Sequence, residues 1–331
     1  MKAAMQAYVL EGTADAPKGA VTAFDTAKLP ADDVTIKVAF SGINYKDAMV
    51  AAGAGKMVRN FPHIPGIDLS GEVVEDASGT FRAGQQVLVT GYDLGVGHLG
   101  GYGQFARVPK GWVVPLPQGL DLREAMVIGT AGFTAMMSLL AMERNGLKPG
   151  QGPILITGAT GGVGSIAIEL FSRAGYDVTA SSGKPDMTDF LKTLGAKEVI
   201  GREALLDESK RVMLKETWAG AVDNVGGTTL EYLLRTTKGW GSVALCGLVQ
   251  SPMYSGSVYP FILRGVNLLG IDSVNCPMSI RLEGWRRMAG PLKPRHLKEI
   301  GKTIHLADLP AKLDEILKGG ARGRYVLELP A

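Results

Sequence analysis

Alternating apolar and polar positions dominate the first third of the chain. The segment "DVTIKVAF" (33–40) alternates as a half-buried β-strand does, and "LSGEVVED" (69–76) and "GQQVLVTG" (84–91) repeat the pattern. Loops rich in glycine and proline, such as "GAGKMVRNFPHIPG", separate these segments. Residues 1–120 therefore predict a β-rich region whose long loops are natural places for function.

The pattern changes near residue 121. The stretch "DLREAMVIGTAGFTAMMSLLAM" predicts a helix, with Asp121 as its N-cap and Glu124 placed to complete a capping box. Its apolar part (126–142) carries no charge over 17 residues, yet two glycines interrupt it. It also falls short of the ~20 apolar residues that a membrane span requires. We expect a buried helix and no membrane association.

From residue 153 onward strands and helices alternate. The strands "PILIT", "DVTAS" and "EVIG" are separated by predicted helices over 162–174 and 186–194. "GAVDNVG", "SVALCG" and "NLLGIDS" supply later strands, with a helix over 228–236 between the first two. Such alternation predicts a parallel sheet covered by helices on both faces. The strand "RYVLELP" near the end is expected to rejoin the first domain.

Composition narrows the class of protein without naming it. A chain of 331 residues with 46% hydrophobic and 20% charged residues is typical of two globular domains. A net charge of +3 without a long basic run argues against a nucleic-acid partner. Two cysteines, Cys246 and Cys276, form no CxxC pair, and the first residues lack the apolar core of a signal peptide. These features favour a reducing, cytoplasmic setting.

The glycine-rich stretch "ITGATGGVG" (156–164) lies between a predicted strand and an amphipathic helix. That context is typical of a dinucleotide fingerprint, although Ala159 replaces the first glycine of the usual pattern. Gly161 lets the backbone approach a pyrophosphate, and Gly164 lets the helix pack closely. Amides at the helix N-terminus then face the phosphate. A tight turn that binds nothing is the simpler alternative.

The end of the second strand distinguishes the two nicotinamide cofactors. An NAD site places an acid about 20 residues after the loop, on the ribose 2′-hydroxyl. Here "TASSGKPD" offers Ser181, Ser182 and Lys184 instead, and no acid stands at the strand end itself. Arg202, after the third strand, is positioned to join them. Donors and cations favour a 2′-phosphate, and hence NADPH.

A nicotinamide implies hydride transfer, so the next question is how the acceptor is activated. Zinc needs three ligands, but the four histidines are scattered and neither cysteine lies near one in sequence. We therefore predict no metal. Reduction of a carbon–carbon double bond conjugated to a carbonyl needs only hydrogen-bond donors for the enolate. Quinones, enals and enoyl-CoA esters all satisfy that requirement.

Donors for such an acceptor occur in "SGINYKDAMVAAG" (41–53). Asn44 carries an amide and Tyr45 a phenol, and we predict both as catalytic residues, with Tyr45 in contact with the nicotinamide end of the cofactor. The alternative is structural: Asn44 and Asp47 cap a helix over 46–52 while Tyr45 packs.

Seven motifs together resemble one family along essentially the whole chain. They are "INYKDAM", "RNFPHIPGIDLSG", "MVIGTAGFTAMM", "ITGATGGVGS", "GAVDNVGG", "PFILRGVNLLGIDSV" and "GRYVLEL". The chain resembles the zinc-independent, quinone-oxidoreductase-like group of the medium-chain dehydrogenase/reductase superfamily, and within it the acryloyl-CoA reductases (NADPH) most of all. Zinc-bearing relatives have a Cys ligand where Asn44 stands and a His ligand where Ile67 stands.

The resemblance implies an α/β architecture of two domains. A GroES-like catalytic domain would comprise residues 1–122 and 300–331, and an NADPH-binding Rossmann domain with a doubly wound parallel sheet would comprise 123–299. It also implies a homodimer, with the sheet extended between subunits near "NLLGID". The implied cofactor contacts are Tyr45, Thr160, Gly161, Gly162, Val163, Ser181, Ser182, Lys184, Arg202, Leu248, Ile262 and Ser273.

The resemblance also ranks the possible acceptors. It places acryloyl-CoA above quinones and enals, with hydride delivered to the β-carbon and the enolate stabilised without metal. An NADPH-binding protein without catalysis is the remaining alternative. An acyl-CoA thioester carries phosphates that need cations. Candidate cations are Lys56, Arg59, Arg264, Arg281, Arg286 and Arg287.

Overall fold

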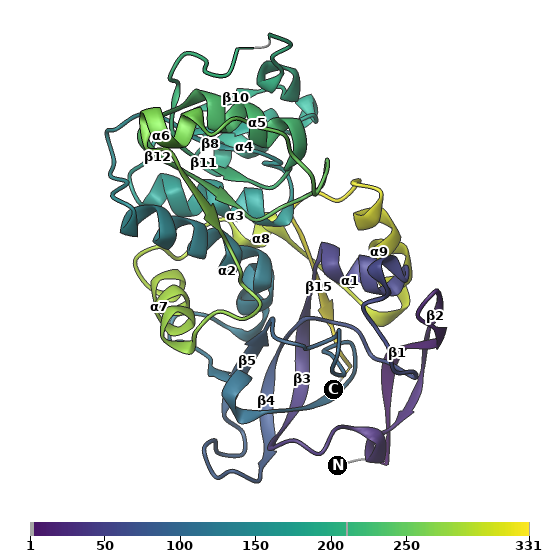
Figure 1. Cartoon of the computed structure of the whole chain (residues 1–331). Helices are drawn as coiled ribbons and strands as arrows, with labels where there is room; N and C mark the ends of the chain where they lie inside the picture. The colour runs from purple at the N-terminus through teal and green to yellow at the C-terminus, as the bar shows by residue number, and fades with distance from the viewer. Residues whose placement is uncertain (1–2, 210, 331) are drawn as a thin grey trace. The chain divides into compact units, whose positions relative to one another are not determined.

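The computed structural model describes residues 3–209 and 211–330 and divides into two compact units (Figure 1). The first unit comprises the chain up to Thr130, Val274–Leu282 and the chain from Leu297 onward. The second comprises Ala131–Ser273 and Glu283–His296.

A mixed sheet forms the centre of the first unit. Across it, among the described residues, the strands follow the order β14 (Gly301–Ile304), β15 (Arg324–Glu328), β3 (Val34–Ile43), β4 (Asp68–Asp76), β5 (Gln86–Thr90) and β7 (Val114–Pro115), with β6 (Phe105–Val108) also paired to β3. A separate hairpin joins β1 (Ala4–Thr13) to β2 (Ala16–Asp25). The three predicted strands are confirmed as β3, β4 and β5. The predicted return of the chain end is confirmed as well, because Tyr325 of β15 pairs with Ile43 of β3.

Short helices complete the first unit. They are α1 (Tyr45–Ala51), α8 (Leu297–Ile300) and α9 (Leu309–Leu317), with 3₁₀ turns at Thr26–Lys28, Ala54–Lys56, Lys110–Trp112 and Leu306–Asp308. Helix α1 packs against α9. Alternate residues of β3, among them Val34, Ile36 and Val38, are buried in the core beneath the sheet, as the alternating pattern predicts.

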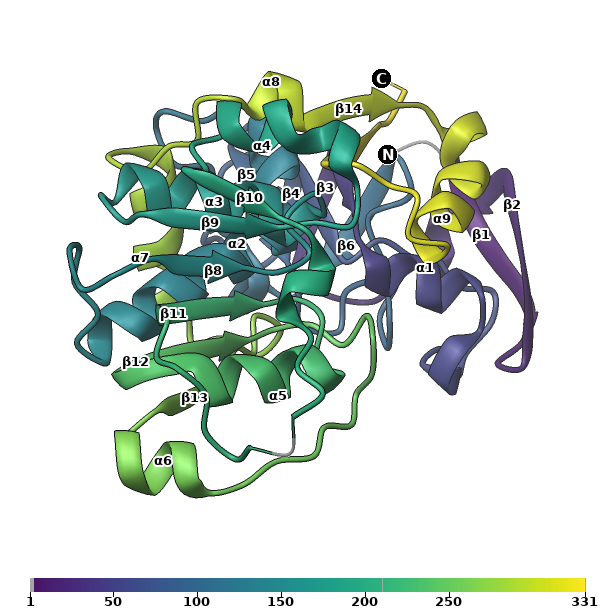
Figure 2. The ribbon, with the colours of Figure 1, turned by 90° about the horizontal axis from the view of Figure 1, so that it is seen from above.

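A parallel sheet forms the centre of the second unit. Its strands lie in the order β10 (Glu198–Ile200), β9 (Val178–Ser181), β8 (Ile154–Ile156), β11 (Trp218–Asp223), β12 (Thr237–Leu245) and β13 (Asn267–Gly270), as Figure 2 shows. The chain runs from β8 to β10 on one side and continues from β11 on the other. This reversal between β8 and β11 is the point where open α/β sheets bind ligands. The predicted Rossmann-type arrangement is confirmed.

Helices pack along this sheet in the expected alternation. They are α3 (Gly162–Arg173) against β8 and β9, α4 (Thr188–Thr193) against β10, α5 (Gly227–Thr236) against β11 and β12, and α6 (Tyr259–Arg264) against β12. Two 3₁₀ turns, Pro185–Met187 and Arg202–Leu205, follow β9 and β10. The helix predicted over 186–194 therefore begins two residues late, because the proline opens a 3₁₀ turn before the α-helix starts.

Helices α2 (Leu122–Arg144) and α7 (Met278–Ala289) contribute residues to both units. The predicted capping box of α2 is confirmed, since Glu124 N–H donates to Asp121 at 2.6 Å and Asp121 N–H donates to Glu124 at 3.2 Å. α2 is long and apolar enough to cross a membrane by composition alone, but 83% of its most apolar window is buried within the protein. This burial agrees with the expected core helix.

The expectation that α2 is continuous is wrong at Gly129. The backbone there has φ 49° and ψ −158°, which no helix allows. A β-carbon at this position would lie 2.4 Å from a carboxylate oxygen of Asp68. The break turns the Thr130 N–H toward that carboxylate, so a tertiary contact outweighs local helix propensity.

The two compact units have other bounds than the predicted domain ranges at three places. Residues 123–130, 274–282 and 297–299 lie in the first unit. Two buried arginines tie the first two of these segments to that unit: Arg324 donates to the carbonyl of Val127 at 3.1 Å, and Arg281 donates to the carbonyl of Thr90 at 2.8 Å.

Candidate active site

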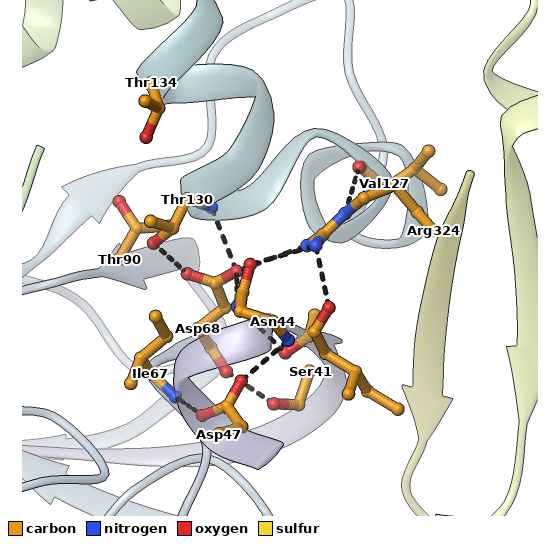
Figure 3. A network of polar contacts seen from close by, with 12 residues as sticks. Ser41, Asn44, Asp47, Ile67, Asp68, Thr90, Val127, Thr130, Thr134 and Arg324 are labelled. Carbon is orange, nitrogen blue, oxygen red and sulfur yellow. Dashed lines mark hydrogen bonds and ion pairs between the residues drawn. The ribbon is translucent and has the colours of Figure 1, made fainter. Parts of the chain in front are cut away.

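A buried polar network surrounds the N-terminus of α1 in the first unit (Figure 3). At its centre is Asp68, a residue with 0% exposure at the start of β4. Its carboxylate accepts hydrogen bonds from the Asn44 amide at 2.8 Å and from the Thr130 N–H at 2.9 Å. The Thr130 hydroxyl donates to the same carboxylate. A carboxylate held by this many donors is stabilised in place despite burial.

Arg324 supplies the positive charge of this network from strand β15. Its guanidinium donates to the Ile43 carbonyl at 2.7 Å and to the Asn44 amide oxygen at 2.9 Å, and it lies 3.5 Å from Asp68. Arg324 is only 3% exposed, and burial lowers the pKa of its guanidinium. The network thus ties β3, β4 and β15 to the helix start.

Asp47, in the first turn of α1, is the second buried acid of the network. Its carboxylate accepts from the main-chain N–H of Asn44 at 2.8 Å and of Ile67 at 2.9 Å. Burial first, and the charge of Asp68 second, raise the pKa of Asp47 to about 6. The contact with Asn44 N–H is one half of the capping interaction that the sequence offered as a structural alternative.

The two predicted catalytic residues have different surroundings. The Asn44 amide is 8% exposed and donates to Asp68 while accepting from Arg324. Tyr45, the first residue of α1, is 40% exposed. The structure therefore favours Asn44 as the residue that fixes the helix start, and leaves the Tyr45 phenol as the accessible donor.

Positions 44 and 67 here offer an amide and an isoleucine side chain. Within residues 3–209 and 211–330, no group of three or more His, Cys, Asp or Glu side chains is arranged to hold a metal ion.

The glycine loop of the second unit joins β8 to α3. Gly158 takes a left-handed φ of 57°. A β-carbon on Gly164 would lie 2.5 Å from the Gly158 carbonyl oxygen, so the close approach predicted for Gly164 requires glycine. Helix α3 begins at Gly162 with Gly161 as N-cap, and its first-turn N–H groups have no acceptor within the helix. Thr160, Gly161, Gly162 and Val163 thus lie together in one turn.

The four residues predicted for the 2′-phosphate also come together. Ser181 at the end of β9 pairs with Ile200 at the end of β10. The Ser182 hydroxyl accepts from the Lys184 N–H at 3.0 Å. Arg202 follows β10 and lies so close to Gly183 that a β-carbon there would be 2.1 Å from its guanidinium. The Ala159 N–H donates to the Ser181 carbonyl at 3.1 Å, which links this group to the glycine loop.

The remaining predicted cofactor residues are less closely connected. Leu248 follows β12 and its Cα would lie 3.5 Å from a β-carbon on Gly226. Ser273 is 8% exposed, and the Thr134 hydroxyl donates to its oxygen at 2.8 Å. Ile262, on α6, is 67% exposed. Their contacts with the nicotinamide side stay predictions.

Sequence reasoning missed a second buried network at the reversal point of the sheet. Asp223, at the end of β11, is 0% exposed and accepts from the Thr157 hydroxyl at 2.8 Å. The Asn224 amide donates to the Thr157 carbonyl at 2.7 Å. Burial raises the pKa of Asp223. The signal was present in "GAVDNVGG", where an acid and an amide directly follow a buried strand next to the reversal.

A β-rich unit, combined with a parallel-sheet unit that carries a glycine loop, is the architecture of an oxidoreductase that uses a nicotinamide dinucleotide. Residues 30–118 match the family "Alcohol dehydrogenase GroES-like domain" and residues 162–288 match "Zinc-binding dehydrogenase". The chain belongs to the zinc-independent, quinone-oxidoreductase-like group of the medium-chain dehydrogenase/reductase superfamily.

Full-length relatives support this assignment. The chain is 48% identical to YhfP of Bacillus subtilis (strain 168), which carries the name quinone oxidoreductase, over 99% of this chain and 100% of the relative. It is 44% identical to acrylyl-CoA reductase AcuI of Ruegeria pomeroyi, over 95% of each chain. The crystal structure of YHDH of Escherichia coli K-12 with bound NADPH is 42% identical, with a TM-score of 0.94 over 98% of this chain and 100% of that one.

Proposed function

We propose that the protein reduces the carbon–carbon double bond of a short 2-enoyl-CoA thioester, acryloyl-CoA to propionyl-CoA, with NADPH. One observation carries the choice of substrate: the resemblance to acrylyl-CoA reductase AcuI at 44% identity over 95% of both chains. A likeness that covers both units includes the loops that shape the substrate site as well as the cofactor site.

The residues of the second unit fit NADPH. The first-turn amides of Gly162 and Val163 are positioned for the pyrophosphate. Lys184 and Arg202 add positive charge beside the Ser181 and Ser182 hydroxyls, which is the donor set that a 2′-phosphate requires. The YHDH structure of E. coli K-12, which holds NADPH, supports the same cofactor. When bound, NADPH supplies the hydride that adds to the β-carbon of the substrate.

Tyr45 is the residue we propose to touch the reacting groups. Addition of hydride at the β-carbon moves negative charge to the thioester oxygen, which a phenol O–H can stabilise by donating a hydrogen bond. The buried network of Asn44, Asp47, Asp68 and Arg324 holds the first turn of α1 and so fixes the Tyr45 backbone. We therefore assign Asn44 a positioning role, through the helix start, in place of direct contact with substrate.

We also propose a homodimer that acts in the cytoplasm. Strand β13 ends the parallel sheet, and an edge strand can pair with the same strand of a second copy. Large apolar side chains are exposed in the segments of the same chain that precede β13. Trp240 is 82% exposed, Val258 64% and Leu263 66%. Such a patch on a compact protein is typical of an interface. Both cysteines are free thiols, as a reducing compartment maintains them.

Quinone reduction is the second candidate, because YhfP shares 48% identity over 99% of this chain. The cofactor half of the reaction is the same. The difference lies in the acceptor, since a quinone has no thioester arm.

One experiment separates the candidates. Oxidation of NADPH is followed by its absorbance with acryloyl-CoA, crotonyl-CoA or a benzoquinone at matched concentrations, with NADH in parallel. Turnover with acryloyl-CoA and NADPH supports the proposal. Turnover with the quinone alone replaces it with the second candidate, and NADPH binding without turnover on any acceptor leaves only a cofactor-binding protein. Tyr45→Phe is then expected to lower kcat, while the exposed Tyr254→Phe serves as its control.

A further inference from the structure

One cavity of the first unit has no role in the chemistry described so far. The cavity holds about 340 Å³, within the size range of small-molecule sites. Two loops enclose it, one following α1 and its 3₁₀ turn and the other following β5. Its lining residues are Met57, Arg59, Asn60, His63, Asp93, Val96 and Gly97.

His63 is the buried polar member of this lining. The residue is 3% exposed, and within the described residues its Nε2 has no hydrogen-bond partner. The ring hydrogen-bonds the main chain of Gly95, which leaves Nε2 as the free nitrogen. Burial lowers the pKa of His63, so the imidazole is neutral near pH 7. A neutral imidazole that donates through one nitrogen accepts through the other, so His63 brings an unused acceptor nitrogen to the wall of the cavity.

The other lining residues restrict what can bind. Arg59 and Asp93 bring one charge of each sign to the exposed rim, and Asn60 adds an amide that both donates and accepts. Met57 and Val96 supply apolar surface. A bare anion would meet the Asp93 carboxylate, whereas a neutral chain with amide or hydroxyl donors satisfies every group present.

The cavity is mechanically connected to the helix that carries Tyr45. Asp47 of α1 accepts from the N–H of Ile67, directly after the first lining loop. The two loops are joined in turn, because the Gly101 N–H donates to the Gly66 carbonyl at 2.8 Å. Gly95 also packs against Gly66, with a β-carbon there only 2.6 Å from the Gly66 nitrogen. The cavity walls therefore keep a fixed position relative to α1 within this unit.

We propose that this cavity binds the pantetheine arm of the acyl-CoA substrate. The arm is a neutral chain with two amide N–H groups, a hydroxyl and a pair of methyl groups. The pantoyl hydroxyl, or the amide N–H joined to the pantoyl carbonyl, donates to Nε2 of His63, and the methyl groups contact Met57 and Val96. The inference rests on the proposed function, and adds to it the residues that distinguish a CoA thioester from a smaller acceptor.

The test compares a full and a truncated substrate. Steady-state kinetics are measured with acryloyl-CoA and with the acryloyl thioester of N-acetylcysteamine, which lacks the pantoyl part of the arm. His63→Leu removes the acceptor and is expected to raise KM for acryloyl-CoA about 2- to 12-fold, the range of one neutral hydrogen bond. KM for the truncated thioester and for NADPH is expected to stay unchanged. His63→Gln, which keeps an acceptor, is expected to recover part of the loss.

A second variant covers the case in which His63→Leu does not fold. Val96→Trp fills the cavity from its half-buried wall and leaves His63 in place. It is expected to raise KM for acryloyl-CoA by a similar factor without affecting the truncated thioester. His305→Leu, at an exposed histidine of the same unit, is the control for substitution itself.

The outcomes separate this inference from the proposed function. If acryloyl-CoA is reduced and neither variant changes the ratio of KM between the two thioesters, the cavity does not bind the arm and the proposed function stands. If the unaltered protein reduces the benzoquinone but neither thioester, the proposed function fails and the inference fails with it.

Discussion

Replacing Arg324 by methionine tests whether the buried network holds the first unit together. The substitution keeps an unbranched side chain of similar length and removes the guanidinium, which is 3% exposed. Three acceptors lose their donor: the Ile43 carbonyl, the Val127 carbonyl and the Asn44 amide oxygen. Asp68 loses its counter-charge while it stays fully buried.

The expected cost follows from these contacts. Breaking a buried ion pair by removing one partner costs about 3–5 kcal/mol, because the other charge stays in a low-dielectric site. Asp68 retains donors from Asn44 and Thr130, which places the loss toward the lower end of that range.

The assay must report on the first unit alone, because the two units can unfold separately. Hydrogen exchange of peptides that cover β3 and β15 gives the local opening free energy, and urea unfolding gives the global value. The matched variant is Arg324→Met combined with Asp68→Asn, which removes both charges and is expected to lose less than the sum of the single losses. A loss below about 1 kcal/mol would refute the reasoning.

Three further predictions concern single positions. Gly129→Ala is expected to lower stability by about 2 kcal/mol or more, because it combines a left-handed φ with a clash; thermal unfolding checks this against Gly79→Ala, which has a left-handed φ but open space around it. Because burial above all raises the pKa of Asp47 to about 6, the folded protein holds that proton more tightly than the unfolded chain. The protonated Asp47 therefore stabilises the fold by about 3 kcal/mol below about pH 4, and this contribution is lost as the pH rises through 6. Urea unfolding of Asp47→Asn is expected to lack this change with pH. Lys184→Ala and Arg202→Ala are each expected to raise KM for NADPH about tenfold and leave KM for NADH unchanged; an equal rise for both cofactors would contradict a 2′-phosphate contact.

Local patterns were enough to predict the second unit. The period of its strands, the glycines of the β8–α3 turn and the polar residues after β9 are all contiguous signals. The proximity of Ser181 and Arg202 was also predictable, because parallel strands end at the same edge of the sheet. The sequence pattern did not predict a site role for Asp223. In sequence Asp223 is only the last residue of a strand, and its importance follows from the reversal between β8 and β11, which the sequence does not show.

The first unit was predicted less completely, because its key contacts join distant residues. Asn44 presents itself as a donor in sequence, but its partner Arg324 is 280 residues away. The break at Gly129 lies in an apolar run whose local preference is a continuous helix. The antiparallel pairing of β15 with β3 brings Arg324 into the network with Asn44 and Asp68. This pairing explains the role of Asn44 and the break at Gly129, and the local sequence does not show it.

The position of strand β15 has a consequence for how the protein is made. It lies between β14 and β3 inside the sheet, and Arg324 contacts Ile43 across a separation of 281 residues. During translation β3, β4 and α1 leave the ribosome long before this strand, so the nascent first unit lacks an interior strand and holds Asp47 and Asp68 without their counter-charge. Most of the second unit, by contrast, is contiguous in the chain and emerges within that interval. Synthesis therefore favours completion of the dinucleotide-type unit first, and leaves the network around α1 to close only when the last strand arrives.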